Sequence, residues 1–211
     1  TTHGHRFHGL GAIELASPEE YESRLETDGY VLADFERRRE LIRERVETLG
    51  REQGGEASIE ADLLEEVTAL VEWPVPLAGR FDEDFLRVPQ EALITAMQEH
   101  QKYFPVLGTD GKLLPAFIFV SNIASTDPEQ VIHGNEKVIR PRLADAAFFY
   151  DNDRNKTLEQ HAEPLKQLVF QHKLGTVADK CERVSQLAAR IAEQIGGDAD
   201  RAAEAGRLSK A

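Results

Sequence analysis

The chain has 211 residues, of which 41% are hydrophobic and 30% are charged, so it has enough apolar material for a core and lacks the composition of a disordered chain. Its 25 basic and 38 acidic residues give a net charge of −13, which repels nucleic-acid phosphates and anionic membranes. Any contact with RNA must therefore come from a local group of cations.

The lone cysteine, Cys181, excludes an internal disulfide and predicts a reducing, cytoplasmic location. The longest apolar run, residues 113–120, is too short to span a membrane, so no membrane segment is expected. The chain begins without Met and ends inside a helical pattern, and we expect it to be a piece of a longer protein.

Strands and helices alternate in the first two-thirds of the chain. Strand material is expected at Arg6-Phe7 and at residues 12–15. Apolar residues at helical spacing predict helices at residues 34–49, 61–72 and 89–101, the last with His100 as a core histidine at its end. Acidic residues concentrate in this part, because residues 19–66 hold 16 acidic and 7 basic side chains.

The first of these helices carries Arg37, Arg38 and Arg39, a cluster that would suit an anionic ligand. Glutamates are interleaved with the arginines, so we interpret this side of the helix as a solvated, ion-paired face. Its apolar stripe consists of Phe35, Ile42, Val46 and Leu49.

A β-hairpin is predicted at residues 103–120, with its turn at residues 109–112 and a second strand buried on both faces. From Thr157 onward the pattern predicts helices alone. Thr157 and Gln160 form a capping box, and Gly175 is expected to end that helix. The stripes expected on the two helices of this part are Leu165, Leu168, Val169 and His172, followed by Val184, Leu187, Ala188, Ile191 and Ile195.

A search for catalytic motifs finds no phosphate-binding glycine loop, no metalloprotease motif, no nucleophile elbow and no EF-hand. His3, His5 and His8 are close in sequence but lack a fourth ligand, so no metal site is predicted. Cys181 has no reactive signature around it, and we interpret it as a partly buried structural cysteine.

Residues 133–149 contain an unusual group of cations. Asn135 is expected to cap a helix with Pro141 in its first turn or at a bend, which would place Lys137, Arg140 and Arg142 near the helix start, where an anion is favoured. The alternative is that the arginines pair with nearby carboxylates. Residue patterns alone favour neither.

The chain resembles the β subunit of the bacterial heterotetrameric glycyl-tRNA synthetase over nearly all 211 residues. Ordered, ungapped blocks carry the resemblance: residues 4–7, 63–67, 71–74, 100–106, 110–115, 117–123, 134–138, 140–146 and 174–176.

The resemblance implies an α/β (α+β) body similar to a B3/B4-like domain at residues 1–155, followed at residues 156–211 by the first helices of an all-α, HD-like domain. It also implies a non-catalytic role in tRNA binding and subunit assembly. Lys102 and Arg6 join Lys137, Arg140 and Arg142 as candidate RNA contacts.

In this family ATP, Mg²⁺ and glycine are used by the separate α subunit, so no cofactor and no catalytic residue are expected in this chain. The implied partners are that α subunit and tRNA(Gly), in an α2β2 heterotetramer. Two alternatives stay open: an editing-type esterase acting on mischarged tRNA, by analogy with B3/B4 domains, and a purely structural protein-interaction module.

Overall fold

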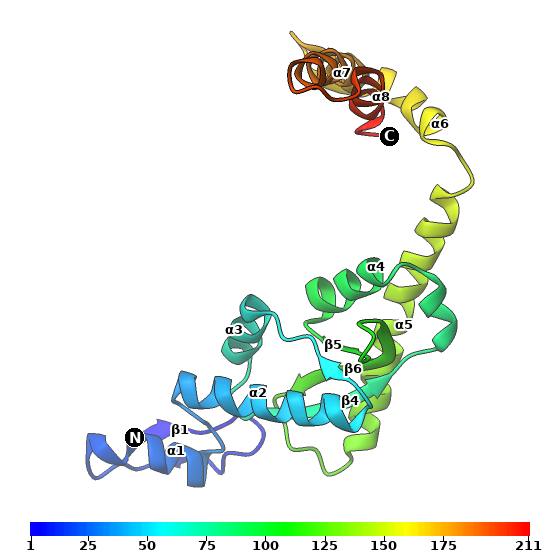
Figure 1. The fold of residues 1–211 in the computed structure, drawn as a ribbon. Coiled ribbons are helices and arrows are strands. Elements are labelled where there is room, and N and C mark those ends of the chain that lie inside the picture. Colours follow the sequence, from blue (N-terminus) through cyan, green and yellow to red (C-terminus); the bar gives the residue numbers. More distant parts are fainter. The chain divides into compact units, whose positions relative to one another are not determined.

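The computed structural model describes residues 1–211, which divide into two compact units, Thr1–Phe148 and Phe149–Ala211 (Figure 1). This division falls within the helix Pro128–Asp153, and the predicted domain boundary after residue 155 lies just beyond the end of that helix. The boundary stays a prediction. The likeness to B3/B4-like and HD-like domains also stays a prediction. None of the helices is both long and apolar enough to cross a membrane.

The chain begins with a small two-stranded sheet, β1 (Thr2–His3) and β2 (Ala12–Ile13), followed by η1 (Pro18–Glu20) and α1 (Tyr21–Gly29). The strand predicted at Arg6-Phe7 is wrong. His5 Nδ1 accepts hydrogen bonds from the backbone N–H groups of Phe7 and His8, which bends residues 6–8 into a turn.

An antiparallel four-stranded sheet forms the centre of the first unit. Its strand order is β3 (Glu56–Ala57), β5 (Phe104–Leu107), β6 (Leu113–Ser121) and β4 (Val75–Arg80). The predicted hairpin is confirmed as β5 and β6, with Gly111 in its turn at φ +75°. Residues 116–119 of β6 are buried on both faces, as predicted.

One face of this sheet packs against α2 (Phe35–Glu52) and α3 (Ala61–Leu70). The predicted stripe of α2 is confirmed at Ile42 and Val46, which are fully buried, whereas Phe35 at its first turn is exposed. The core on this face consists of Ile42, Val46, Leu63, Leu64, Val67, Val71, Phe104, Val106, Ala116 and Ile118.

The opposite face carries an aromatic group centred on Tyr103. Its ring stacks on Phe117, with centroids 4.7 Å apart, and lies 5.8 Å from Phe119. The Tyr103 hydroxyl donates a 2.6 Å hydrogen bond to Asn135 Oδ1 in α5 (Pro128–Asp153). This contact fastens α5 to the hairpin.

The segment before β5 contains η2 (Glu83–Arg87), α4 (Gln90–Thr95) and η3 (Ala96–His100), where the chain widens into one π-helical turn. Leu93 and Met97 are buried, as the helical spacing predicts. The prediction of a core histidine is wrong, because His100 is exposed at the end of this turn.

The helix that Asn135 was expected to cap begins eight residues earlier, at Pro128, where Asp127 Oδ1 accepts from the backbone N–H of Gln130. Asn135 is inside α5 and donates to the carbonyl of Val131, so it is not a cap. Pro141 lies in the interior of α5. The expected helix start beside the cations is therefore wrong.

The second unit contains α6 (Leu158–Ala162), η4 (Glu163–Lys166), β7 (Val169–Gln171), β8 (Gly175–Thr176), α7 (Val177–Gln194) and α8 (Ala199–Leu208). The capping box of Thr157 and Gln160 is confirmed. The prediction of helices alone is wrong, because β7 and β8 form a hairpin and Gly175, at φ +86°, belongs to it.

The pair α7 and α8 packs through small residues rather than through the predicted apolar stripe. Cys181 and Ser185 are buried in α7, and a Cβ added at Gly206 of α8 would lie 2.7 Å from Ser185 Cα. The large apolar residues of the predicted stripe point elsewhere and are exposed: Val184, Leu187 and Ile191 in α7, and Ile195 directly after it.

Candidate nucleic-acid interface

The three cations of α5 are exposed and unpaired. Lys137, Arg140 and Arg142 make no ion pair, no side-chain hydrogen bond and no contact with an aromatic ring. The carboxylate of Glu136, which the alternative interpretation offers as a partner, instead accepts from the backbone N–H of Arg80 at 2.9 Å. The structure therefore does not contain the ion pairs of the alternative interpretation, in which Arg140 and Arg142 pair with nearby carboxylates.

These three side chains are unusual within the first unit, which contains fifteen arginines and lysines. Each of the other twelve forms an ion pair, a hydrogen bond or a ring contact. The cations of this unit that make no side-chain contact are therefore confined to one stretch of α5.

The three cations do not share one side of the helix. Residues three apart on an α-helix are neighbours, whereas residues two apart point to different sides. Lys137 and Arg140 therefore lie on one side, and Arg142 lies on another, with Asp145 one turn beyond it. The pair of Lys137 and Arg140 is the stronger local source of positive potential.

The two remaining candidates are placed elsewhere and are engaged. Lys102, in the left-handed region at φ +59°, forms a 2.8 Å ion pair with Glu66 of α3. Arg6 lies in the turn near the chain start, with its guanidinium 5.6 Å from the ring centroid of Phe7. Unlike the α5 cations, these two residues thus already have partners within the chain.

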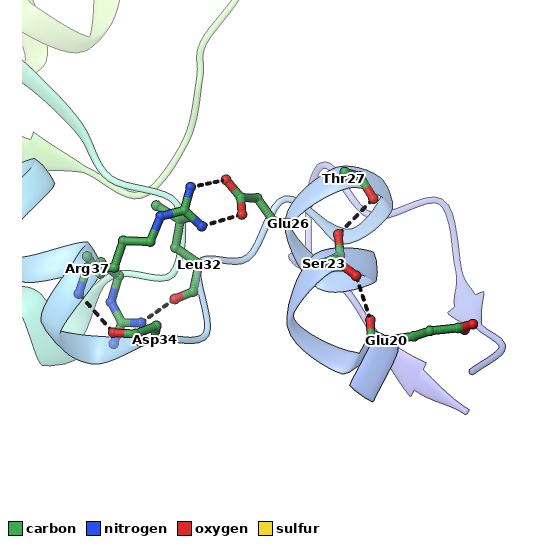
Figure 2. A network of polar contacts seen from close by, with 8 residues as sticks. Glu20, Ser23, Glu26, Thr27, Leu32, Asp34 and Arg37 are labelled. Carbon is green, nitrogen blue, oxygen red and sulfur yellow. Dashed lines mark hydrogen bonds and ion pairs between the residues drawn. The ribbon is translucent and has the colours of Figure 1, made fainter. Parts of the chain in front are cut away.

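The arginines of α2 have structural partners. Arg37 donates two hydrogen bonds, of 2.5 and 2.7 Å, to the carboxylate of Glu26 in α1 (Figure 2), and this contact lowers the pKa of Glu26. Arg39 pairs with Glu36 and lies 3.7 Å from Glu65. The predicted ion-paired face is confirmed for these two arginines.

Arg38 behaves differently from its neighbours. Its guanidinium donates to the carbonyls of Leu32 and Ala33 and, at 3.0 Å, to the carbonyl of Thr68 near the end of α3. Burial lowers the pKa of Arg38 from its ordinary value, although the nearby Asp34 and Glu72 act in the opposite direction. Arg38 thus ties α2 to two backbone segments, a role that the sequence pattern did not reveal.

A groove in the first unit was not indicated by the sequence. It has a volume of about 640 Å³ and is walled mainly by Leu32, Leu41, Trp73, Pro74 and Val75. Charged side chains of α1 and α2 stand at its rim: Glu26, Arg37, Glu40, Glu44 and Arg45. No histidine, cysteine, serine, threonine or tyrosine lines it, so it offers no hydroxyl or thiol nucleophile and no imidazole base.

The histidines near the chain start do not converge on a metal. His5 Nδ1 accepts two backbone hydrogen bonds, and His8 Nε2 accepts one from the backbone N–H of Ala124 at 3.0 Å. The structure contains no group of three or more histidine, cysteine, aspartate or glutamate side chains that could hold a metal ion. Cys181, predicted to be partly buried, is buried.

Comparison with known proteins gives a consistent result over the whole chain. The sequence model of a family described as glycyl-tRNA synthetase beta subunit matches residues 1–211. Proteins named glycine–tRNA ligase beta subunit are 58% identical over 208 residues in Stutzerimonas stutzeri (strain A1501) and 54% identical over 210 residues in Hahella chejuensis (strain KCTC 2396). These matches cover 99% and 100% of this chain and 30% of each relative, so the chain spans less than a third of their length.

Proposed function

The chain belongs to the glycyl-tRNA synthetase beta subunit family, and from this premise we propose that it is a non-catalytic part of a glycine–tRNA ligase that binds tRNA(Gly) and holds the enzyme together. The observation that carries the tRNA-binding part is the set of unpaired cations on α5. Within the first unit, the unpaired cations of α5 are the groups most available to phosphates.

The chemical step of the ligase belongs, in this proposal, to the α subunit, which uses ATP and Mg²⁺ to activate glycine. The partners proposed are this α subunit and tRNA(Gly), in an α2β2 assembly. A cytoplasmic location is part of the same proposal, because tRNA charging supplies protein synthesis. The absence of a phosphate-binding glycine loop from the sequence agrees with this division of labour.

An editing-type esterase would need a pocket with convergent polar groups and a residue that activates water. The groove lacks an imidazole, and the carboxylate of Glu26 at its rim has a lowered pKa because Arg37 donates to it. A lowered pKa makes a carboxylate a weaker base. No observation therefore favours the esterase over the binding role.

The test is tRNA binding by the assembled ligase as a function of salt concentration, with Lys137→Ala, Arg140→Ala and Arg142→Ala introduced one at a time. Each lost phosphate contact is expected to weaken binding and to lower the salt slope by about one unit, with little change in glycine activation. Lys112→Ala is the matched control, because Lys112 is an exposed cation at the hairpin turn that pairs with Asp110.

Retention of the wild-type affinity and salt slope by all three variants would refute the RNA contact on α5. A variant that loses the assembly or the fold, but binds tRNA with the wild-type slope, would instead assign its side chain a structural role. Circular dichroism and size-exclusion chromatography of each variant separate these outcomes.

A further inference from the structure

The groove of the first unit is a second surface that the RNA contact on α5 leaves unused. Its volume of about 640 Å³ lies within the range of pockets that bury most of a small ligand or a group of side chains. Leu41 of α2 faces Trp73, Pro74 and Val75 across a mainly apolar lining. An apolar group that entered here would leave water, which favours binding.

The wall of the groove is fixed by contacts between distant parts of the chain. Trp73 meets Tyr30 edge to face, with centroids 5.4 Å apart, and Tyr30 lies 5.2 Å from His8. The backbone N–H of Trp73 donates to Asn122 Oδ1 at 3.0 Å, and His8 accepts from Ala124, which also lines the groove. A wall held in this way loses little conformational entropy when a ligand binds.

Some charges at the rim are already compensated. Glu26 and Arg37 neutralise each other through their two hydrogen bonds (Figure 2), whereas Arg45 donates to the neutral carbonyl of Pro74 at 3.3 Å and keeps its positive charge. The carboxylate of Glu44 has no partner, and that of Glu40 lies 3.7 Å from Arg43, a long and exposed contact. The charge that remains free at the rim is therefore mainly negative.

The acidic character continues beyond the rim. A small neighbouring hollow shares Glu26, Leu32 and Arg37 with the groove and adds the carboxylates of Glu22 and Asp34. Together the two hollows are lined by five carboxylates and two guanidinium groups, a net charge of −3. This field attracts cations and repels phosphates.

We propose that the groove binds a segment of a protein partner that presents a large apolar side chain flanked by arginine or lysine. The apolar side chain would occupy the space beside Leu41 and Trp73, and the flanking cations would meet Glu40 and Glu44. RNA is disfavoured as the occupant because of the net negative charge of the lining. The inference goes beyond the proposed RNA contact on α5 and does not depend on it.

Trp73 is the only tryptophan of the chain, so its fluorescence reports on this groove alone. The probe is a synthetic capped peptide, acetyl-Arg-Leu-Arg-Leu-Arg-amide, titrated into the 211-residue chain. We expect a saturable change in Trp73 emission that weakens as NaCl is added. The same peptide with glutamate in place of each arginine should produce no saturable change.

Two pairs of substitutions on α2 give a matched comparison. Glu40→Gln with Glu44→Gln removes two carboxylates at the rim and is expected to weaken peptide binding roughly fivefold or more. Glu47→Gln with Glu52→Gln removes two exposed carboxylates from the same helix away from the groove, and should leave the affinity within about twofold. Leu41→Ala should also weaken binding, through loss of apolar contact.

The proposal is overturned if the basic peptide leaves Trp73 emission unchanged, if both pairs weaken binding equally, or if the acidic peptide binds as well. A further arm titrates poly-uridine RNA at the same salt concentration. Saturable quenching of Trp73 by the RNA, in the absence of a peptide effect, would show that the groove is a nucleic-acid site instead. All four glutamates are exposed, so these variants are expected to fold.

Discussion

The hydrogen bond from Tyr103 to Asn135 is a single contact through which the hairpin holds α5, and its loss has a measurable cost. Tyr103→Phe keeps the ring that stacks on Phe117 but removes the hydroxyl and leaves Asn135 Oδ1 without this donor. A buried hydrogen bond of this kind contributes about 0.5–1.5 kcal/mol, and an acceptor left without a partner adds to the loss. We expect the free energy of unfolding of the first unit to fall by about 1–2 kcal/mol at pH 8.

The same residue predicts how stability changes with pH. Burial raises the pKa of Tyr103 to about 12 in the folded chain, whereas a tyrosine in an unfolded chain has a pKa of about 10. The buried neutral phenol therefore contributes stability that is complete below pH 10 and is lost as the pH rises from 10 toward 12. Between pH 8 and pH 11 the wild-type chain should lose about 1.4 kcal/mol more than Tyr103→Phe, so the difference between them nearly disappears.

Urea denaturation followed by the fluorescence of Trp73 is the suitable assay, because this residue reports on the first unit alone and avoids treating two units as one transition. Lysines also titrate near pH 10–11, but they are the same in both chains and cancel in the difference. A stability difference that stays constant from pH 8 to pH 11 would refute the buried, hydrogen-bonded hydroxyl. A double-mutant cycle with Asn135→Ala should show a coupling of about 1 kcal/mol.

Two further predictions concern packing. Phe119 is 4% exposed, so Phe119→Ala should cost about 3–5 kcal/mol in the same Trp73 assay, and a loss under about 1 kcal/mol would place this ring outside the core. Gly206→Ala inserts a Cβ 2.7 Å from Ser185 Cα, so α7 and α8 must move apart, and the second unit should lose about 1–3 kcal/mol, measured by circular dichroism. If the thermal transition of that variant is unchanged, the space between α7 and α8 at Gly206 is wider than the 2.7 Å distance indicates.

The elements that the sequence predicted best are those with a long, regular pattern and a local end signal. The helix at 34–49 combines an apolar stripe with Asp34, whose side chain accepts from the backbone N–H of Arg37. The hairpin combines a continuous apolar run with a turn that contains Gly111. In each case local preference and burial agree, so neighbouring residues suffice for the prediction.

The sequence pattern misplaces the start of α5 because Asn and Pro are common at helix starts but also occur inside helices. Asn135 followed by Pro141 resembles a helix start, yet Asn135 binds the Tyr103 hydroxyl across 32 residues, and this tertiary contact is invisible in a local pattern. Interior prolines are normally costly in a helix. The buried residues Ile139 and Leu143 on either side of Pro141 hold the helix together through packing.

The second unit was misjudged for a different reason. The apolar residues of α7 have the spacing of a core stripe, but Gly206 and Ser185 bring α8 close to another side of the helix. The spacing of apolar residues shows that a helix is amphipathic, but it does not show which side of the helix packs against a particular neighbouring helix. Likewise, Val169, which the helical spacing placed on a buried helix face, belongs to the short strand β7 and is exposed.

The candidate site was only half visible in the sequence for a related reason. The identity of Lys137, Arg140 and Arg142 was evident, but the fact that sets them apart is the absence of partners, which depends on where every carboxylate lies. From the sequence, Arg37 could bind an anion equally well, but in the structure it is paired with Glu26, eleven residues away. A pattern of residues cannot separate free from paired charges when the pairing is tertiary.

This distribution of pairing gives the first unit two surfaces of opposite character. On α2, pairing consumes arginines and leaves carboxylates at the groove, so a partner there must bring positive charge. On α5, Glu136 is held by the backbone N–H of Arg80 and forms no ion pair with Lys137 or Arg140, so these two neighbouring cations remain open to an anionic partner. A phosphate attracted to α5 is repelled by the groove, and a basic peptide attracted to the groove is repelled by the cations of α5. Exchange of the two partners between the two surfaces is thus disfavoured by charge alone, and added salt should reduce this discrimination as it weakens both contacts.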